Sequence, residues 1–401
     1  MINSKNLGLK RNIEIGILEI RRHIPVLYTF MKICKTSNTN VTIFTTKELL
    51  ARLENYDIKE ENFNFILKEN NESYRSYLKR IEKICNDKID LLFVNTIHET
   101  IWDLLCHITF NPQSKTILVV HHANAWLKPR FVFNLFHMLR TIDTNLSSIL
   151  IRKFIFPKFD AIDVIYRPVR DHILTDIGFD KEIFTLPTSV FEEKTYTIRQ
   201  KDDKLLKIVI PGLIQMHRKD FASVIPAFEN LFKRFKSNIE LYIPGMPVGR
   251  YGKLIYDRFN KMRETGYKIS IFDSFVPDQL FDQILLKSDI ILAPIKIKTR
   301  ADSEIEEEYG KTVGSGVVYN AILYAKPIIV PSEFNMIKEL NSSTLKYKNP
   351  GELEKQIEEL IIKPDKLKKL ETEAFRNARK YSLTNLQEYF EKNVLTWLKN
   401  N

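Results

Sequence analysis

The segment with the clearest chemical potential is residues 311–331, KTVGSGVVYNAILYAKPIIVP. Gly314, Ser315 and Gly316 stand where a helix should begin. The first turn of a helix has unpaired N–H groups and a partial positive charge, and glycine lets an anion approach the backbone. The segment therefore predicts a phosphate site, and an ordinary helix with a glycine-rich start is the alternative.

The fold that positions this segment is indicated by strands and helices that alternate along the whole chain. In the first half, buried strands are expected at 13–20, 41–46, 90–96, 115–121 and 161–166, with helices between them, the first at 23–34 with Pro25 in its first turn. In the second half, strands are expected at 206–210, 239–243, 268–272, 289–294 and 328–330, again with helices between them and a further helix at 333–340. This pattern predicts an α/β protein with two Rossmann-like doubly wound parallel sheets. Ligands bind such sheets beyond the carboxyl ends of the strands.

Length and local composition predict the domain organisation. A chain of 401 residues is too long for one typical core. We expect an acceptor-binding domain at 1–190, a polar linker at 191–204, a second domain at 205–380, and a C-terminal helix at 381–401. Thr384 and Gln387 predict a capping box for that helix, which should pack back towards the first domain. The cleft between two such domains is the default active site.

The overall composition describes a folded protein, with 44% hydrophobic and 28% charged residues. Three widely spaced cysteines suggest a reducing compartment and neither a disulfide framework nor a zinc cluster. The sequence shows no signal peptide and no apolar run long enough to span a bilayer. We therefore expect a cytoplasmic protein, with association to the inner face of the plasma membrane as a further option.

A formal net charge of +11 indicates an anionic partner. Residues 125–158 hold six of the cations and one acid, Asp143, interleaved with bulky apolar side chains. This mixture is typical of an interfacial helix on an anionic membrane, and a core helix with a basic rim is the alternative. No nucleic-acid-binding motif is present, so we expect no nucleic acid partner.

Five segments resemble, in order, the nucleotide-sugar-binding half of GT-B glycosyltransferases, closest in layout to the retaining family 4. They are IFTLPTSVF, KIVIPGLIQMHRKDFASVIPAFENL, IELYIPG, ISIFDSFVPDQLFDQILLKSDIILAP and the glycine-rich segment above. The resemblance covers residues 184–340, and the first half is similar in architecture only. It implies a nucleotide-diphosphate sugar as donor substrate, with neither a metal nor another cofactor.

The resemblance also implies roles for individual residues on the donor side. Arg218 and Lys219 match a basic pair that would stabilise the leaving diphosphate. Backbone and polar groups that would border the donor are Gly212, Ser274, Val276, Gly314, Ser315, Gly316 and Asn320.

One departure from the family pattern concerns two glutamates spaced eight positions apart. Aligned on AKPIIVP, these positions hold Thr312 and Asn320. Asn320 can still bind ribose hydroxyls through its amide, whereas Thr312 offers no carboxylate. The acidic run at 306–308 could substitute, or it is a solvated loop. The stereochemical outcome of the transfer therefore stays open.

Candidate acceptor-side residues follow strands of the first half. His98 follows one strand, and His121 and His122 end another, so these side chains should lie at carboxyl ends of the sheet. A histidine there suits either sugar contact or general-base catalysis, because its pKa lies near neutrality. Further candidates are Glu19 as an acid or base, and Asn124 and Trp126 as sugar contacts.

We therefore predict a hexosyltransferase-like glycosyltransferase that serves surface polysaccharide or glycoconjugate synthesis with a glycan or lipid-linked acceptor. Two other classes stay open at this point. One is a non-catalytic GT-B partner subunit, because the glutamates are replaced. The other is a nucleotide-sugar epimerase of the same two-domain build.

Overall fold

The structure is a computed structural model that describes residues 11–54, 56, 60–97, 100–128, 131–193, 205–300 and 303–401. Contacts within the chain define two compact units. The first contains residues 1–119, 153–163 and 387–401, and the second contains residues 120–152 and 164–386. Most of the predicted linker lies outside the described residues, and the predicted domain boundaries stay a prediction.

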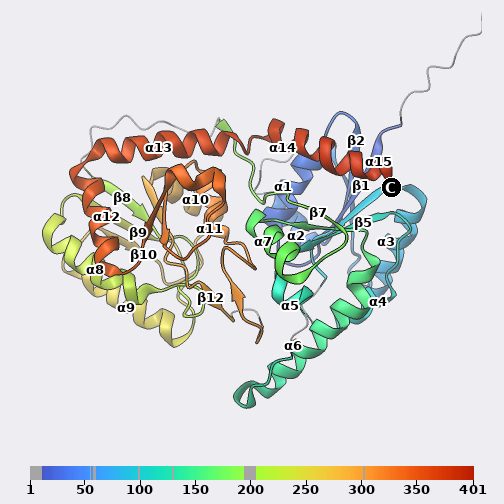
Figure 1. The fold of residues 1–401 in the computed structure, drawn as a ribbon, viewed down its shortest axis with the longest axis horizontal. Coiled ribbons are helices and arrows are strands. Elements are labelled where there is room, and N and C mark those ends of the chain that lie inside the picture. The colour runs from blue at the N-terminus through green and yellow to red at the C-terminus, as the bar shows by residue number, and fades with distance from the viewer. Residues whose placement is uncertain are drawn as a thin grey trace, which may run out of the picture. The chain divides into compact units, whose positions relative to one another are not determined.

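A parallel sheet organises the first half of the chain (Figure 1). Its described strands are β1 (Ile13–Leu18), β2 (Thr39–Thr45), β3 (Asn64–Leu67), β4 (Leu91–Val94), β5 (Lys115–Val120), β6 (Ala161–Val164) and β7 (Glu182–Phe184). They are arranged in the order β3-β2-β1-β4-β5-β6-β7. The central strand β1 pairs in parallel with β2 and β4, and all four residues of β4 are buried. This burial on both faces explains the unbroken apolar run in the sequence of β4.

The helices of the first half connect these strands. They are α1 (Ile24–Cys34), α2 (Lys47–Leu53), α3 (Tyr74–Lys88), α4 (Ile101–Thr109), α5 (Ala123–Leu127), α6 (Met138–Leu150) and α7 (Arg167–His172). Pro25 lies in the first turn of α1, as expected, where its missing N–H has no intrahelical partner to lose. A capping box closes the start of α4, because Thr100 and Asp103 each accept the other's backbone N–H.

A second parallel sheet organises the second half. Its strands are β8 (Leu206–Val209), β9 (Ile239–Ile243), β10 (Ile269–Ile271), β11 (Ile290–Leu292), β14 (Ile328–Pro331) and β15 (Thr344–Tyr347), in the order β10-β9-β8-β11-β14-β15. A small antiparallel hairpin joins β12 (Lys298–Thr299) and β13 (Glu307–Glu308). Together the two sheets confirm the predicted α/β class with two Rossmann-like folds.

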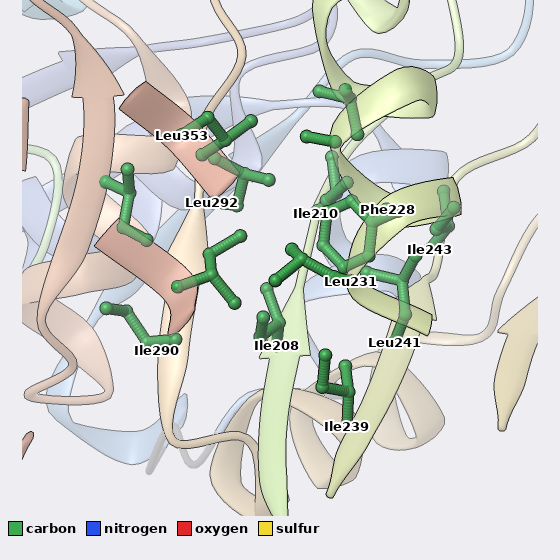
Figure 2. Close-up of a cluster of buried hydrophobic side chains, with 14 of the residues drawn as sticks. Ile208, Ile210, Phe228, Leu231, Ile239, Leu241, Ile243, Ile290, Leu292 and Leu353 are labelled. Carbon is green, nitrogen blue, oxygen red and sulfur yellow. The ribbon is translucent and has the colours of Figure 1, made fainter. Parts of the chain in front are cut away.

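The main core of the second sheet lies between its strands and four helices, α8, α9, α12 and α13 (Figure 2). The helices of this half are α8 (Phe221–Phe235), α9 (Gly249–Glu264), α10 (Asp278–Lys287), α11 (Gly316–Leu323), α12 (Pro350–Ile362) and α13 (Pro364–Arg379). Phe228 and Leu231 of α8 face Ile208 and Leu241 of the sheet, and Leu353 of α12 joins the same cluster. The apolar face of α8 is thus what fixes the helix onto the sheet.

The chain end returns to the first unit through α14 (Leu383–Tyr389), a π-helical stretch (Phe390–Leu395) and α15 (Thr396–Asn400). The Gln387 side chain donates to the carbonyl oxygens of Lys32 at 3.0 Å and Lys35 at 2.6 Å, at the end of α1. The ring of Phe390 lies 6.4 Å from that of Phe93 on β4. The predicted return of the C-terminal helix is confirmed.

Several local predictions differ from the structure. The short strands β3, β7 and β15 and the helix α13 were not predicted from the sequence. A helix expected at 333–340 is wrong, because the described structure there is a 3₁₀ stretch over Lys338–Ser343. The capping box at Thr384 is also wrong, since Ser382 accepts the N–H of Asn385 at 3.4 Å and starts the helix two residues earlier.

Throughout the described ranges, every helix is too short or too polar to cross a bilayer.

We predict that Leu231→Ala lowers the free energy of unfolding by about 2–5 kcal/mol, because it leaves a cavity in a fully buried cluster. The matched control is Leu254→Ala on α9, where the side chain is 60% exposed and the change should stay within about 0.5 kcal/mol. Chemical denaturation followed by circular dichroism measures both. Equal effects of the two substitutions would contradict the assignment of Leu231 to the core.

Candidate functional site

The loops after β8 and β9 approach each other closely at two glycines. Gly212 has a φ of +88°, which favours glycine, and a Cβ on Gly245 would lie 2.1 Å from the carbonyl oxygen of Gly212. Ile214 N–H donates to Met246 O at 3.0 Å, and Val248 N–H donates to Ile214 O at 3.0 Å. Glycine is therefore required at both positions for the two strand ends to form one joint loop surface.

The buried side chain of Lys219 stabilises this loop surface. Its side chain is buried, and Nζ donates to the carbonyl oxygens of Pro211 and of Gly212, the latter at 2.6 Å. Burial lowers the pKa of the Lys219 ammonium to about 7, while the two carbonyl acceptors favour the charged form. The residue that was predicted to bind the donor thus also positions the Gly212 turn.

Arg218 lies on the same turn, which is fixed by the segment that follows β11. Lys296 N–H donates to Arg218 O at 3.1 Å, and Asp220 N–H donates to Pro294 O at 2.7 Å. The half-buried Arg218 guanidinium lies 3.5 Å from the hydroxyl of Tyr309, which follows the hairpin strand β13. The structure therefore brings the basic pair next to the segment that leads into α11.

The start of α11 combines Gly314, Ser315 and Gly316, as expected from the sequence. Ser315 is the N-cap residue, yet within the described chain its side chain makes no capping hydrogen bond to the helix. A Cβ on Gly316 would meet no atom within 4 Å, whereas one on Gly314 would contact Tyr166 at 3.2 Å. The backbone at Gly316 therefore borders open space, as an anion site at a helix start requires.

Glu307 is buried, with 4% of its surface exposed, and its carboxylate caps another helix. Its two oxygens accept the N–H groups of Asn124 at 3.3 Å and Ala125 at 2.8 Å, in the first turn of α5. Anions favour this end of a helix because of the backbone dipole. The interpretation of residues 306–308 as a solvated loop is therefore wrong for Glu307.

A neighbouring contact places the His121–His122 turn beside Thr312, in the segment that leads into α11. Ala123 N–H donates to Thr312 O at 3.1 Å, and Thr312 itself is buried, with its hydroxyl accepting the N–H of Glu308 at 2.7 Å. His121 lies edge-on to the buried Trp126, with ring centroids 6.1 Å apart. Both histidines are partly exposed.

A polar network behind this turn was not predicted from the sequence. His172 on α7 lies 3.2 Å from Asn124 Oδ1 through Nε2 and 2.7 Å from Asp176 through Nδ1. Lys311 pairs with Asp176 at 3.2 Å. Hydrogen bonds from Thr175, Lys311 and His172 lower the pKa of Asp176 to about 2, and burial lowers that of His172. Only the i, i+4 spacing of His172 and Asp176 was a sequence signal for it.

Asn124 is committed to this network rather than to an open surface. Its Nδ2 donates to Glu306 O at 3.0 Å while its Oδ1 faces His172. The side chain thus positions the turn that carries the histidines.

The remaining predicted residues lie apart from this cluster. Glu19 is fully buried in the first unit, where its oxygens accept from Arg21 N–H and Thr96 Oγ1, both at 2.7 Å. Ser274 is exposed and Val276 is buried after β10, and Asn320 is half-buried on α11. His98 lies outside the described residues. Across the described ranges, no group of three His, Cys, Asp or Glu is arranged to hold a metal ion.

Comparison with known proteins is informative at the level of fold. No protein-family model matches the sequence, and no curated protein matches it. Among solved structures, sucrose-phosphate synthase from Thermosynechococcus elongatus is similar with a TM-score of 0.63 and 11% identity, over 97% of this chain and 100% of that one. HepE of Anabaena, in complex with UDP and glucose, is similar with a TM-score of 0.62 and 12% identity, over 96% and 99%.

A third similar structure is the UDP-GlcNAc 2-epimerase of Neisseria meningitidis bound to UDP-GlcNAc. It has a TM-score of 0.55 and 13% identity over 96% of this chain and 100% of that one. The chain therefore has the GT-B fold, which it shares with these three structures. This confirms the fold expected from the sequence resemblance.

The pKa of Lys219 leads to a prediction about stability and pH. Unfolded lysine keeps its proton up to a pKa of about 10.4, whereas the folded group titrates at about 7, so the unfolded state holds more protons between these values. Stability should therefore rise with pH in this range, by up to about 2 kcal/mol from pH 7 to pH 9 relative to Lys219→Met. Chemical denaturation at both pH values measures the difference. Parallel pH profiles of the two proteins would refute the assignment.

Proposed function

We propose that the protein is a glycosyltransferase that moves a sugar from a nucleotide-diphosphate sugar to a glycan or lipid-linked acceptor on the cytosolic side of a membrane. The observation that carries the proposal is the uncapped start of α11 with open space at Gly316. A diphosphate could approach the backbone N–H groups there. The GT-B fold, and the UDP held by the similar HepE, support this donor class.

The leaving group explains the role proposed for Arg218. When the bond between sugar and diphosphate breaks, negative charge grows on the phosphate oxygens. A guanidinium stays charged at all relevant pH values and offers several N–H donors, so it stabilises this charge. Lys219 keeps the neighbouring Gly212 turn in place, and a bound diphosphate would raise its lowered pKa again.

Proton removal from the acceptor hydroxyl is assigned to His121 or His122. A neutral imidazole accepts a proton near pH 7, and the backbone contact from Ala123 to Thr312 ties this turn to the donor segment. Glu19 is less suited, because its two oxygens already accept hydrogen bonds inside the first unit. Position 312 holds a threonine, so no carboxylate acts there. Asn320 is assigned to the ribose hydroxyls.

The similarity to UDP-GlcNAc 2-epimerases favours a second candidate function, an epimerase of nucleotide sugars. An epimerase would return a nucleotide sugar with an inverted sugar carbon. A transferase would release the nucleoside diphosphate. A third candidate is a non-catalytic partner subunit, because the two glutamates of the family pattern are replaced by Thr312 and Asn320. Such a subunit would bind nucleotide without turnover.

A donor panel separates these functions. We expect the protein, incubated with UDP-, GDP- and CMP-sugars and a membrane extract as acceptor source, to release one nucleotide in an acceptor-dependent manner. Chromatography of the nucleotides also reveals any epimerised sugar. Epimerised product would favour the epimerase, and nucleotide binding without any turnover would favour the non-catalytic subunit.

Substitution of Arg218 tests the electrostatic role. We expect Arg218→Met to lower turnover by about 10²-fold, the typical loss when one strong donor to a developing charge is removed. The control is Arg258→Met on α9, whose guanidinium pairs with Glu229 on the surface at 2.6 Å and should leave turnover unchanged. An unchanged rate in the Arg218 variant would remove Arg218 from the mechanism.

Gly316→Ala tests the anion site without disturbing the fold. The new methyl group meets no protein atom, and alanine favours a helix, so the melting temperature should not fall. The methyl would stand where phosphate is proposed to approach, so we expect binding of the nucleoside diphosphate to weaken about tenfold or more. Gly351→Ala, in the first turn of α12, is the matched control for calorimetric titration. Equal affinities of the two variants would argue against phosphate at α11.

A further inference from the structure

Helix α6 has its polar side buried and its apolar side exposed, the reverse of an ordinary helix in a folded domain. The buried side chains are small and polar: Thr141, Thr144, Asn145, Ser147 and Ser148. The exposed side chains are Met138, Leu139, Ile142, Leu146 and Ile149, which recur every three or four residues along one face. The alternative of a core helix with a basic rim is therefore wrong for α6.

Specific hydrogen bonds fix this orientation. The side chain of Asn145 accepts from Val132 N–H at 3.0 Å and donates to Val132 O at 2.8 Å. Thr141 donates to Asn134 O at 3.3 Å, and Thr144 accepts the N–H of Glu304 at 3.3 Å. Rotating the helix to bury its apolar face would break these hydrogen bonds. The fold therefore holds the apolar face of α6 on the surface.

The segment before α6 extends the same surface. Phe131, Phe133, Leu135 and Phe136 are all exposed, Phe136 to 94% and Leu139 of the helix to 81%. Together with the exposed residues of α6, these four form a surface that we call the apolar ridge. Contiguous exposed apolar side chains of this number mark an interaction site.

Charge indicates what covers the apolar ridge. Asp143 is the single acid within residues 125–158, against six cations, and Arg152 and Lys153 lie in the π-helical stretch Ile151–Ile155 that follows α6. Arg140 is partly neutralised by Glu304, with Nε and Oε1 3.3 Å apart. A second copy of the chain would place these cations next to like charges, whereas an anionic lipid surface has the complementary charge.

We propose that the apolar ridge inserts into the headgroup and acyl boundary of an anionic lipid monolayer. Aromatic and aliphatic side chains flanked by cations are the composition that such interfacial helices use. The polar face of α6 stays hydrogen-bonded to the protein, so insertion needs no unfolding of the helix. The proposal does not depend on the glycosyltransferase activity, because it concerns only binding to lipid.

Vesicle flotation of the full chain tests the proposal. We expect the protein to float with vesicles of phosphatidylcholine and phosphatidylglycerol, to float less with pure phosphatidylcholine, and to stay bound to the anionic vesicles in 0.5 M salt. Salt resistance follows because apolar burial is not screened, whereas adsorption by charge alone is. Complete release by 0.5 M salt would overturn insertion in favour of electrostatic adsorption.

A matched pair of variants locates the contact. Phe136→Ser with Leu139→Ser should lower the vesicle partition coefficient about tenfold or more, because two apolar side chains no longer leave water. Leu254→Ser with Ile362→Ser changes two side chains that are 60% and 59% exposed on α9 and α12, and it should leave binding unchanged. Both variants should keep the wild-type melting temperature.

Two further outcomes would overturn the proposal. One is equal flotation of the wild type and the Phe136 and Leu139 variant. The other is a wild type that does not float but forms a dimer in light scattering, which the ridge variant dissociates; that result would assign the ridge to a second copy of the chain.

Discussion

The buried carboxylate of Glu307 is the contact on which the candidate site depends. By capping α5 it joins the turn after β5 to the hairpin strand β13, although the two are about 180 residues apart in the chain. A carboxylate in the dry interior is stable only when it is well hydrogen-bonded, and the N–H groups of a helix start meet that need. From this contact the chain runs through Thr312 to the glycine-rich start of α11. Glu304, three residues earlier, holds α6 through Arg140.

The residues that matter in this arrangement divide into those that face outward and those that hold others in place. Lys219, Asn124 and Glu307 are buried and bind backbone or side-chain groups of the protein itself. Arg218, Gly316 and the two histidines keep some exposure. Residue types that suggest catalysis in a sequence thus serve in part as internal supports. This division follows from the cost of burying charge, which is met only by specific partners.

The fold could be predicted because its signals are local. Buried parallel strands such as Leu91–Val94 form unbroken apolar runs, and Pro25 and the glycines at 314 and 316 mark helix starts. The missed strands are three or four residues long, too short for a period to show. In the candidate site, the basic pair and the glycine-rich turn could be found from sequence order. The capping role of Glu307 and the orientation of α6 could not, because both depend on contacts between residues far apart in the chain.

The short path from Glu304 to Gly316 has a geometric consequence. The apolar ridge and the start of α11 belong to the same compact unit, and this segment connects them. A bilayer that holds the ridge would therefore also set the height of the glycine-rich start of α11 above the lipid surface. An acceptor anchored in the same bilayer would have to span that height with its own chain, so the protein would select acceptors by length as well as by chemistry.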